Sequence, residues 1–272
     1  MAMDGSDSKD LERFDDEAHA GNRQFVTALA RGLELLRCFG PGEREVGITE
    51  LARRTGIPKP TVARLAGTLA ELGYLDYLPS QGKYRLGPGV LSLGYAMLSN
   101  LDVRDVARPM MRELAEQSQT SVSIGMRDRL SLVYVETIRS SASITLQRGI
   151  GTRLPLATTA MGRAYLAGLP DAERSLLMDQ IRLRNEQDWP ALKAGIEQGL
   201  RDYAERGFCV SVGDWDKDTC GVGVPFRAPD GVMMAFNCGV AAFKFTPERL
   251  ASEIGPSLVN MVKKVSGSMG RI

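Results

Sequence analysis

The positions of apolar residues predict a run of short helices near the N-terminus. Between residues 25 and 39, apolar side chains recur at the spacing that places them on one face of a helix: Val26, Leu29, Leu33 and Leu36. Gly40-Pro41-Gly42 ends this helix, because proline cannot continue the helical hydrogen bonds and glycine accepts the dihedrals of a helix end. A second helix is expected over residues 48–55, where Thr49 can cap the first turn.

The next turn has the pattern of a helix-turn-helix. Gly56 permits a left-handed residue, and Ile57 can fill the angle between two helices. A third helix begins near Pro60, which suits a first helical turn because its missing N–H would have no partner there. Its apolar face predicts a packed side made of Val62, Leu65, Leu69 and Leu72.

The opposite face of the third helix is small and carries the candidates for DNA contact. Arg64 has the planar fork that pairs with guanine, while Ala63 and Gly67 would let the helix backbone lie close to base edges. Pro60 lies on the same exposed face. Phosphate contacts are expected from Lys59, Thr61 and Thr68.

Two short strands joined by a turn are expected after this helix, over residues 74–78 and 83–86. Lys83 and Arg85 alternate with Tyr84 and Leu86, so one face is basic and the other packs on the helices. Such a hairpin is a wing that reaches the DNA backbone or minor groove. The order of helices and hairpin predicts a winged helix-turn-helix that binds DNA; the alternative is the same module used for protein contacts.

Strands and helices alternate in the rest of the chain, after an apolar connecting helix over residues 87–102. A helix over 103–119 follows, and strands are expected at 122–126, 132–137, 143–147, 208–212, 221–226 and 232–239. Further helices are expected at 160–167, 171–182 and 190–206, and a last one begins at Thr246-Pro247. Strands with hairpins, interrupted by helices, predict an α+β domain with an antiparallel sheet.

A loop of glycines and arginines over residues 148–153 leads into the helix at 160–167. The first turn of that helix, Thr159 to Gly162, presents backbone N–H groups that the helix itself leaves unpaired. Those donors and the helix dipole attract anions, so a carboxylate ligand fits there. The alternative is an ordinary capped helix beside solvated arginines.

Length and composition add domain boundaries. The 272 residues suffice for two domains, and the sequence has neither a long apolar run nor a signal peptide, which indicates a cytoplasmic protein without membrane contact. Residues 1–22 are acidic and polar, as in a disordered tail. We therefore expect a DNA-binding domain over 23–86, a linker helix over 87–102 and a ligand-binding domain over 103–272.

The cysteines and the single histidine bear on chemistry. The chain has 4 cysteines without a CxxC pair, and His19 lies in the acidic tail, so neither a metal site nor another cofactor site is expected. Scarce histidine also argues against an enzyme, because a nucleophile needs a positioned base. Buried reduced thiols are the simple interpretation; a redox sensor or a thiol enzyme that uses Cys209, Cys220 and Cys238 is the alternative.

Several motifs in order resemble the IclR family of transcriptional regulators. The resemblance rests on Leu51 to Lys59, Leu72-Gly73-Tyr74-Leu75, Tyr84 to Gly87, Leu154 to Thr158, Met161 to Ala164, Glu205 to Phe208, Val224-Pro225 and Asp230-Gly231. It implies a winged helix, a GAF-like effector domain, and a homodimer or dimer of dimers on a palindromic double-stranded operator. It also implies an organic-acid effector, often aromatic or short.

The resemblance further implies an effector pocket at Leu154, Thr158, Ala160, Met161, Ser211, Cys220, Gly221 and Cys238. Ser211 stands where some members have an acidic residue, Asn237-Cys238-Gly239 replaces a serine-bearing strand, and Pro60 replaces a serine. The effector's identity is therefore not carried over. Trp215 either covers the ligand or packs in an exposed loop of its own domain.

Overall fold

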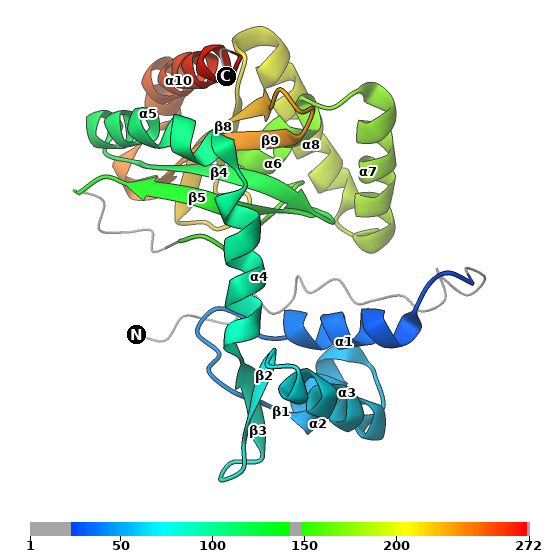
Figure 1. Cartoon of the computed structure of the whole chain (residues 1–272). Helices are drawn as coiled ribbons and strands as arrows, with labels where there is room; N and C mark the ends of the chain where they lie inside the picture. The colour runs from blue at the N-terminus through cyan, green and yellow to red at the C-terminus, as the bar shows by residue number, and fades with distance from the viewer. Residues whose placement is uncertain (1–22, 142–147, 271–272) are drawn as a thin grey trace. The chain divides into compact units, whose positions relative to one another are not determined.

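The computed structural model describes residues 23–141 and 148–270 and divides the chain into two compact units, with the boundary along the chain between Asn100 and Leu101 (Figure 1). The predicted acidic tail with His19 and the predicted strand at 143–147 lie outside the described residues. Within the described ranges, no helix is long and apolar enough to cross a membrane.

The first unit combines helices with a small antiparallel sheet. Its strands lie in the order β1-β3-β2, so a short strand that sequence reasoning missed, β1, joins the predicted hairpin. The elements are α1 (Thr27–Arg37), β1 (Val46–Gly47), α2 (Ile48–Thr55), α3 (Lys59–Glu71), β2 (Leu75–Leu78), β3 (Lys83–Leu86) and α4 (Pro88–Ser99).

The core of this unit sits where the first three helices meet. Leu35, Leu51 and Val62 are fully buried, and Ile57 fills the angle between α2 and α3 as predicted. Gly56 adopts φ 73°, which a side chain would strain, and its N–H donates to the Ala52 carbonyl at 2.9 Å. The turn thereby fixes the angle at which α3 leaves α2.

Three details of the first unit differ from the sequence prediction. The stripe at Val26, Leu29 and Leu33 is exposed, whereas Leu35 is buried, because α1 meets α3 on the side of Gly32, where an added Cβ would lie 4.0 Å from the Leu65 side chain. Leu72 and Leu86, which were expected to pack on the helices, are exposed, whereas Ala66 of α3 is buried. Thr49 does not cap α2, which starts after Gly47 without a side-chain cap.

The second unit is built on a six-stranded antiparallel sheet with the order β6-β5-β4-β9-β8-β7. Its elements are α5 (Asp102–Ser118), β4 (Ser121–Asp128), β5 (Ser131–Arg139), β6 (Arg153–Pro155), α6 (Ala160–Ala167), α7 (Asp171–Arg184), α8 (Trp189–Arg206), β7 (Cys209–Val212), β8 (Thr219–Arg227), β9 (Met233–Ala241), a 3₁₀ turn (Ala242–Lys244), α9 (Pro247–Arg249), a π-helical turn (Leu250–Ile254) and α10 (Gly255–Met269). The predicted fold class, α+β with a winged helix-turn-helix and an antiparallel sheet, is confirmed.

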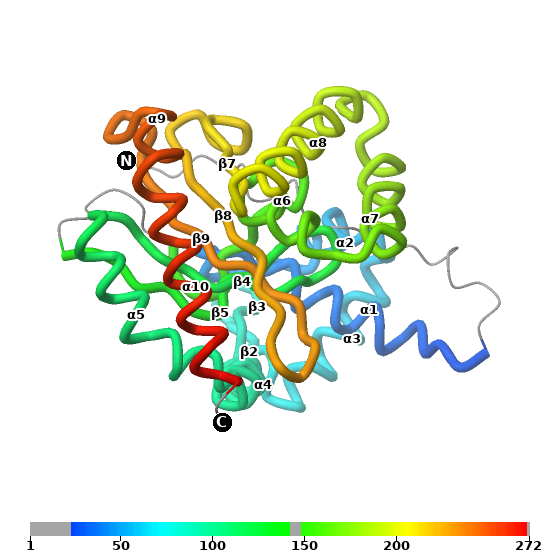
Figure 2. The backbone as a smooth tube through the Cα atoms, turned by 90° about the horizontal axis from the view of Figure 1, so that it is seen from above, coloured from blue at the N-terminus to red at the C-terminus, as the bar shows by residue number. Residues whose placement is uncertain are grey.

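Helices cover both faces of this sheet. α5 and α10 lie side by side over one face, while α6 packs on the other face with α8 outside it (Figure 2). Thr246 caps the last helical segment as predicted, since its hydroxyl accepts from the Arg249 N–H at 3.3 Å.

An irregularity in β5 directs two side chains, two residues apart, to opposite faces of the sheet; in a regular strand they would share a face. Gly125 pairs with Tyr134 and Ile124 with Glu136, so Val135 is an extra residue in β5. Glu136 consequently faces α5, where its carboxylate lies 2.8 Å from Arg108 and 3.3 Å from Arg104. Tyr134 lies on the α6 side, at the cavity described next.

Candidate functional site

The exposed face of α3 carries the residues that the sequence singled out for DNA contact. Lys59, Pro60, Arg64 and Thr68 are exposed, and Thr61, Ala63 and Gly67 are half-buried. The Thr68 hydroxyl donates to the Arg64 carbonyl at 3.1 Å. Arg64 and Lys59 have no ion-pair partner among the residues that the structure describes, so their charges are available to a polyanion.

Lys83 and Arg85 on the wing are already paired. Lys83 Nζ lies 3.6 Å from Glu45, and Arg85 Nε lies 3.0 Å from Asp76 on the neighbouring strand. Exposed pairs of this kind contribute at most about 1 kcal/mol, so phosphate groups can replace the carboxylates. The two wing cations therefore offer a weaker field than the exposed face of α3.

Gly67 has no packing reason to be a glycine. A Cβ built there would meet no heavy atom within 4 Å, and the backbone is not in the left-handed region. Glycine in a helix interior costs about 0.5–1 kcal/mol relative to alanine. The missing side chain therefore leaves space on the outer side of α3, beside Arg64.

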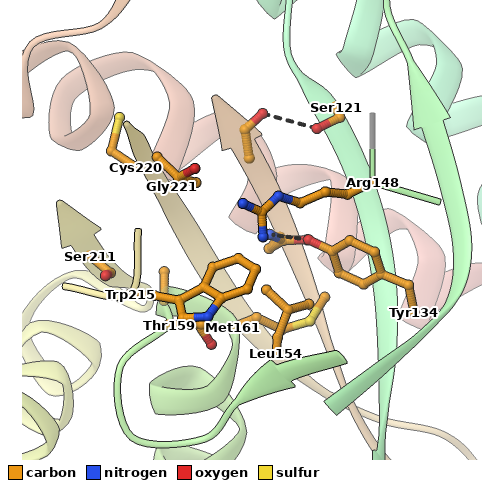
Figure 3. A pocket seen from close by; sticks show the side chains of 14 residues that line it. Ser121, Tyr134, Arg148, Leu154, Thr159, Met161, Ser211, Trp215, Cys220 and Gly221 are labelled. Atoms are coloured by element: carbon orange, nitrogen blue, oxygen red, sulfur yellow. Dashed lines mark hydrogen bonds between the residues drawn. The ribbon is translucent and has the colours of Figure 1, made fainter. Parts of the chain in front are cut away.

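A cavity in the second unit lies between the start of α6 and the sheet (Figure 3). It is lined by Ser121, Tyr134, Arg148, Leu154, Thr159, Ala160, Met161, Ser211, Trp215, Thr219, Cys220, Gly221, Asn237 and Gly239. Its empty volume is about 500 Å³ with the open mouth included. The space that can hold the centre of a water molecule is about 40 Å³, or room for about three waters.

Most of the pocket residues expected from the sequence come together there. Leu154, Ala160, Met161, Ser211, Cys220 and Gly221 line the cavity, but Thr158 and Cys238 do not. Thr158 instead accepts at its carbonyl from the Ser211 hydroxyl at 2.8 Å. Because side chains alternate along a strand, Asn237 and Gly239 face the cavity and Cys238 between them faces the other side of the sheet.

The N-terminus of α6 points its free donors at the cavity. Thr159 is the N-cap, and its hydroxyl accepts from the Gly162 N–H at 3.0 Å. The N–H groups of Ala160 and Met161 have no acceptor within the helix. Gly223 lets β8 approach this turn, since a Cβ there would lie 2.3 Å from the Ala160 carbonyl oxygen.

Two arginines hold the loop around Trp215 from both sides. Arg148 bonds Asp216 at 2.6 Å and stacks on the Trp215 ring, with its guanidinium carbon 3.9 Å from the ring centroid. Arg163, which is buried, bonds Asp214 at 2.7 Å. In Figure 3 the Arg148 guanidinium lies between Trp215 and Tyr134. Trp215 is half-buried, packs on the core and covers part of the cavity.

Polar side chains form the inner wall of the cavity. The Asn237 amide nitrogen donates to the Tyr134 hydroxyl at 3.1 Å. Burial raises the pKa of Tyr134 above its ordinary value, so the phenol keeps its proton at neutral pH. A ligand in the cavity would meet the Arg148 guanidinium, which is paired with Asp216, the N–H groups at the start of α6, and neutral hydroxyls.

The cysteines do not form a reactive cluster. All four are free and buried. Burial raises the pKa of Cys209 and Cys238 to about 12 and that of Cys220 to about 11, so their thiols stay protonated at neutral pH. No two of these three are register partners in the sheet, and no group of His, Cys, Asp or Glu in the described ranges could hold a metal ion. Buried thiols oppose the redox and thiol-enzyme alternatives.

Family models match both units. The IclR helix-turn-helix domain matches residues 28–79, and the bacterial transcriptional regulator IclR C-terminal domain matches residues 95–267. The chain belongs to the IclR family. It is a DNA-binding transcriptional regulator with an effector-binding C-terminal domain and is not an enzyme.

Relatives within the IclR family cover nearly the whole chain. The HTH-type transcriptional regulator TsaQ1/TsaQ2 of Comamonas testosteroni is 33% identical over 93% of this chain and 92% of its own length. A crystal structure of an IclR family regulator from Brucella abortus is 44% identical, covers 95% of this chain and 98% of that chain, and has a TM-score of 0.85. An IclR homolog from Microbacterium hydrocarbonoxydans, complexed with 4-hydroxybenzoate, is 18% identical with a TM-score of 0.67 over 90% of this chain and 100% of that chain, a likeness of fold.

Sequence reasoning missed several residues of the cavity in this IclR-family domain. Tyr134 and Asn237 come from two strands that are distant in the sequence, and neither carries a local motif. Arg148 was visible as the first residue of the glycine and arginine loop. Its position over Trp215 could not be read from that loop, because the two residues meet only in the folded unit.

Proposed function

We propose that this regulator binds a palindromic operator through α3 and the wing, and that a small organic acid in the cavity controls this binding. On this proposal residues 23–86 are the DNA-binding domain, residues 87–102 the linker helix and residues 103–272 the effector-binding domain. The observation that supports an acidic effector is that the Arg148 guanidinium and the free N–H groups at the start of α6 line the same cavity.

Arg64 is the proposed base reader. It is exposed, has no ion-pair partner among the described residues, and lies beside the space left by Gly67. A bidentate arginine contact to guanine is worth about 1–3 kcal/mol of discrimination. The other proposed DNA contacts are Lys59, Pro60, Thr61, Ala63, Gly67, Thr68, Lys83 and Arg85.

Binding to operator duplexes selected with the wild-type protein tests the DNA assignment. Arg64→Ala should weaken binding by about 1–3 kcal/mol and relax the preference at one base position. Lys83→Ala should weaken binding to all duplexes and reduce the salt dependence by about one phosphate contact. The control is Arg182→Ala on α7, in the other unit. Unchanged operator affinity in Arg64→Ala would refute the assignment of the base reader.

The proposed effector is an anion because the described residues that line the cavity include a guanidinium and the N-terminal turn of α6 but no carboxylate. Arg148 can leave Asp216, since the Asp216 side chain is 39% exposed and can be hydrated. A compact acid fits the space as it stands. An aromatic acid requires Arg148 or Trp215 to move, which would change the loop that Asp214 and Asp216 hold.

Titration calorimetry with a panel of aliphatic and aromatic carboxylates tests the effector. An acid that binds should also change operator affinity, and Arg148→Gln should weaken its binding by roughly tenfold or more, as for a lost charged hydrogen bond. Arg153→Gln is the matched control, because Arg153 follows the same loop as the first residue of β6 but bonds Asp128, and neither residue lines the cavity. If no acid binds, or if both variants behave alike, the proposal fails.

Self-association is proposed to occur through α4. This helix has no buried residue, and its apolar side chains include Leu91 at 74% and Tyr95 at 70% exposure. An exposed apolar helix next to a DNA-binding module fits a second copy of the chain, which a palindromic operator also requires. Leu91→Glu should lower the mass measured by sedimentation, whereas Leu183→Glu on α7 should leave it unchanged. A dimer that persists in Leu91→Glu would exclude α4 as the interface.

A further inference from the structure

The wall of the cavity contains a buried acceptor without a partner. The side-chain oxygen of Asn237 is shielded from solvent and accepts no hydrogen bond among the described residues, while the residue as a whole is 6% exposed. The amide nitrogen of the same side chain is already used, since it donates to Tyr134. The oxygen is therefore the free end of an amide that the fold holds in place.

An acceptor in this state is unfavourable in the folded protein. A buried polar group that gives up its water without gaining a partner costs about as much as a lost hydrogen bond. The Thr219 hydroxyl, which also lines the cavity, likewise has no partner in the described part of the chain, but a hydroxyl can donate or accept and so does not select a ligand group. Among the described residues that line the cavity, only the Asn237 side-chain oxygen is a buried acceptor that lacks a donor.

The unsatisfied oxygen lies close to the proposed anion site. Asn237 is the register partner of Gly223, and Gly223 is the residue against which the first turn of α6 packs. Neighbouring strands lie about 4.8 Å apart, so one small molecule can reach both the α6 N–H groups and Asn237. The cavity thus combines donors for an acid group with an acceptor for a second group.

We infer that the effector of this regulator is an acid that also carries an O–H or N–H donor, and that this donor binds the side-chain oxygen of Asn237. The inference rests on the proposed function, because it assigns the second recognition contact of the same cavity. Hydroxy acids belong to the class, whereas acids with only alkyl, keto or methoxy groups do not.

Matched pairs of acids test the inference with the full-length wild-type protein. Titration calorimetry compares lactate with propionate, and 3-hydroxybenzoate and 4-hydroxybenzoate with benzoate. At least one hydroxy acid should bind roughly tenfold or more tightly than its unsubstituted partner, the range for a hydrogen bond completed in a buried site. Pyruvate and 4-methoxybenzoate, which can only accept, should gain nothing over propionate and benzoate.

Variants of β9 then assign the preference to one side chain. Asn237→Leu has a similar size but no amide, and it should bring the hydroxy acid and its partner to equal affinity. Cys238→Ala, one residue further on the opposite face of the sheet, should keep the preference. If Asn237→Leu does not fold, as judged by circular dichroism, the comparison of acids with the wild-type protein still tests whether the cavity prefers an acid that carries a donor.

The outcomes separate this inference from the proposed function. Acids that bind without any preference for a hydroxyl overturn the inference and leave the proposed function standing; an ordered water would then satisfy Asn237. A preference for pyruvate or 4-methoxybenzoate overturns it as well, because the amide would then present its N–H group. An undiminished preference in Asn237→Leu excludes Asn237. If no acid binds, the proposed function and the inference both fail.

Discussion

Gly67→Ala should stabilise the first unit and at the same time weaken operator binding. The substitution adds one methyl group to the outer face of α3, where no atom beyond its chain neighbours and the adjacent backbone of its own helix lies within 4 Å of the new carbon. Inside the folded protein the methyl group therefore meets nothing. Against DNA it would occupy the space through which the helix backbone is proposed to approach base edges.

Gly67→Ala is expected to raise the folding stability of the first unit and to lower its affinity for the operator. Replacing a helix-interior glycine by alanine stabilises by about 0.5–1 kcal/mol, mainly because the unfolded chain loses freedom. For a unit of this size that corresponds to a rise of roughly 2–8 °C in Tm. A disturbed base contact costs about 1–3 kcal/mol, which is a roughly 5- to 140-fold loss of operator affinity.

Thermal unfolding and fluorescence anisotropy on a selected operator measure the two effects at one salt concentration. The slope of affinity against salt should not change, because no phosphate contact is removed. Gly267→Ala in α10 is the matched control: its new carbon also meets nothing within 4 Å, so it should stabilise the second unit without affecting the operator. A Gly67→Ala protein that is more stable and binds the operator as the wild type does would refute the close approach of α3.

Three further predictions concern the second unit, the acid stability of the first, and the thiols. Glu136→Gln should leave acid binding intact but reduce its effect on operator affinity by about 0.5–2 kcal/mol, because the pairs with Arg104 and Arg108 join the bulged strand to the start of α5; a full response would exclude this route. Hydrogen bonds from Arg53 and Arg54 lower the pKa of Glu50 from its ordinary 4.5 to about 2, so its stabilising effect is present above pH 4.5 and lost as the pH falls toward about 2. Acid unfolding followed by circular dichroism should therefore be less steep in Glu50→Gln, and an identical profile would contradict the assignment. Native protein at pH 8 should resist alkylation at Cys220, whose pKa burial raises to about 11, until it is unfolded; fast labelling of the native state would show an open, reactive thiol.

The parts of the fold that carry local end signals were predictable from the sequence. The helix expected at 160–167 has those bounds in the structure, since Thr159 caps it and Gly168 follows its end. The turn at Gly56 and the cap at Thr246 were predicted for the same reason. Each of these features depends on a few residues that are adjacent in the sequence, so it can be predicted without knowing how distant parts of the chain pack.

Predictions that depend on a partner surface were less successful. Periodicity identified the apolar stripe at Val26, Leu29 and Leu33, but it could not tell whether that stripe faces the core of its own unit or solvent. The structure buries Leu35 and Gly32 instead, because the small side of α1 meets α3. Which face of an amphipathic helix is covered depends on the neighbouring helix, and that information is not local.

In the cavity, too, the features that depend on distant parts of the chain were not predicted from the sequence. The family resemblance implied Cys238 in the cavity, whereas Asn237 lines it; a one-residue difference in a strand moves a side chain to the other face of a sheet. The bulge at Val135 has no sequence signature, yet it turns Tyr134 toward Asn237 and Glu136 toward α5.

The motif residue that holds α6 in position and the residues proposed to select a ligand therefore belong to different parts of the second unit. In the motif Met161 to Ala164, the buried Arg163 bonds the Ala157 carbonyl and packs against Gly195 and Gly199, so the motif holds α6 in position. The groups proposed to select a ligand come from outside it: the Arg148 guanidinium and the Asn237 oxygen, both in the cavity lining. Because the motif keeps the proposed anion-binding end of α6 in place, we expect substitutions at those other positions to change the preferred acid while the fold and the proposed response to an acid persist.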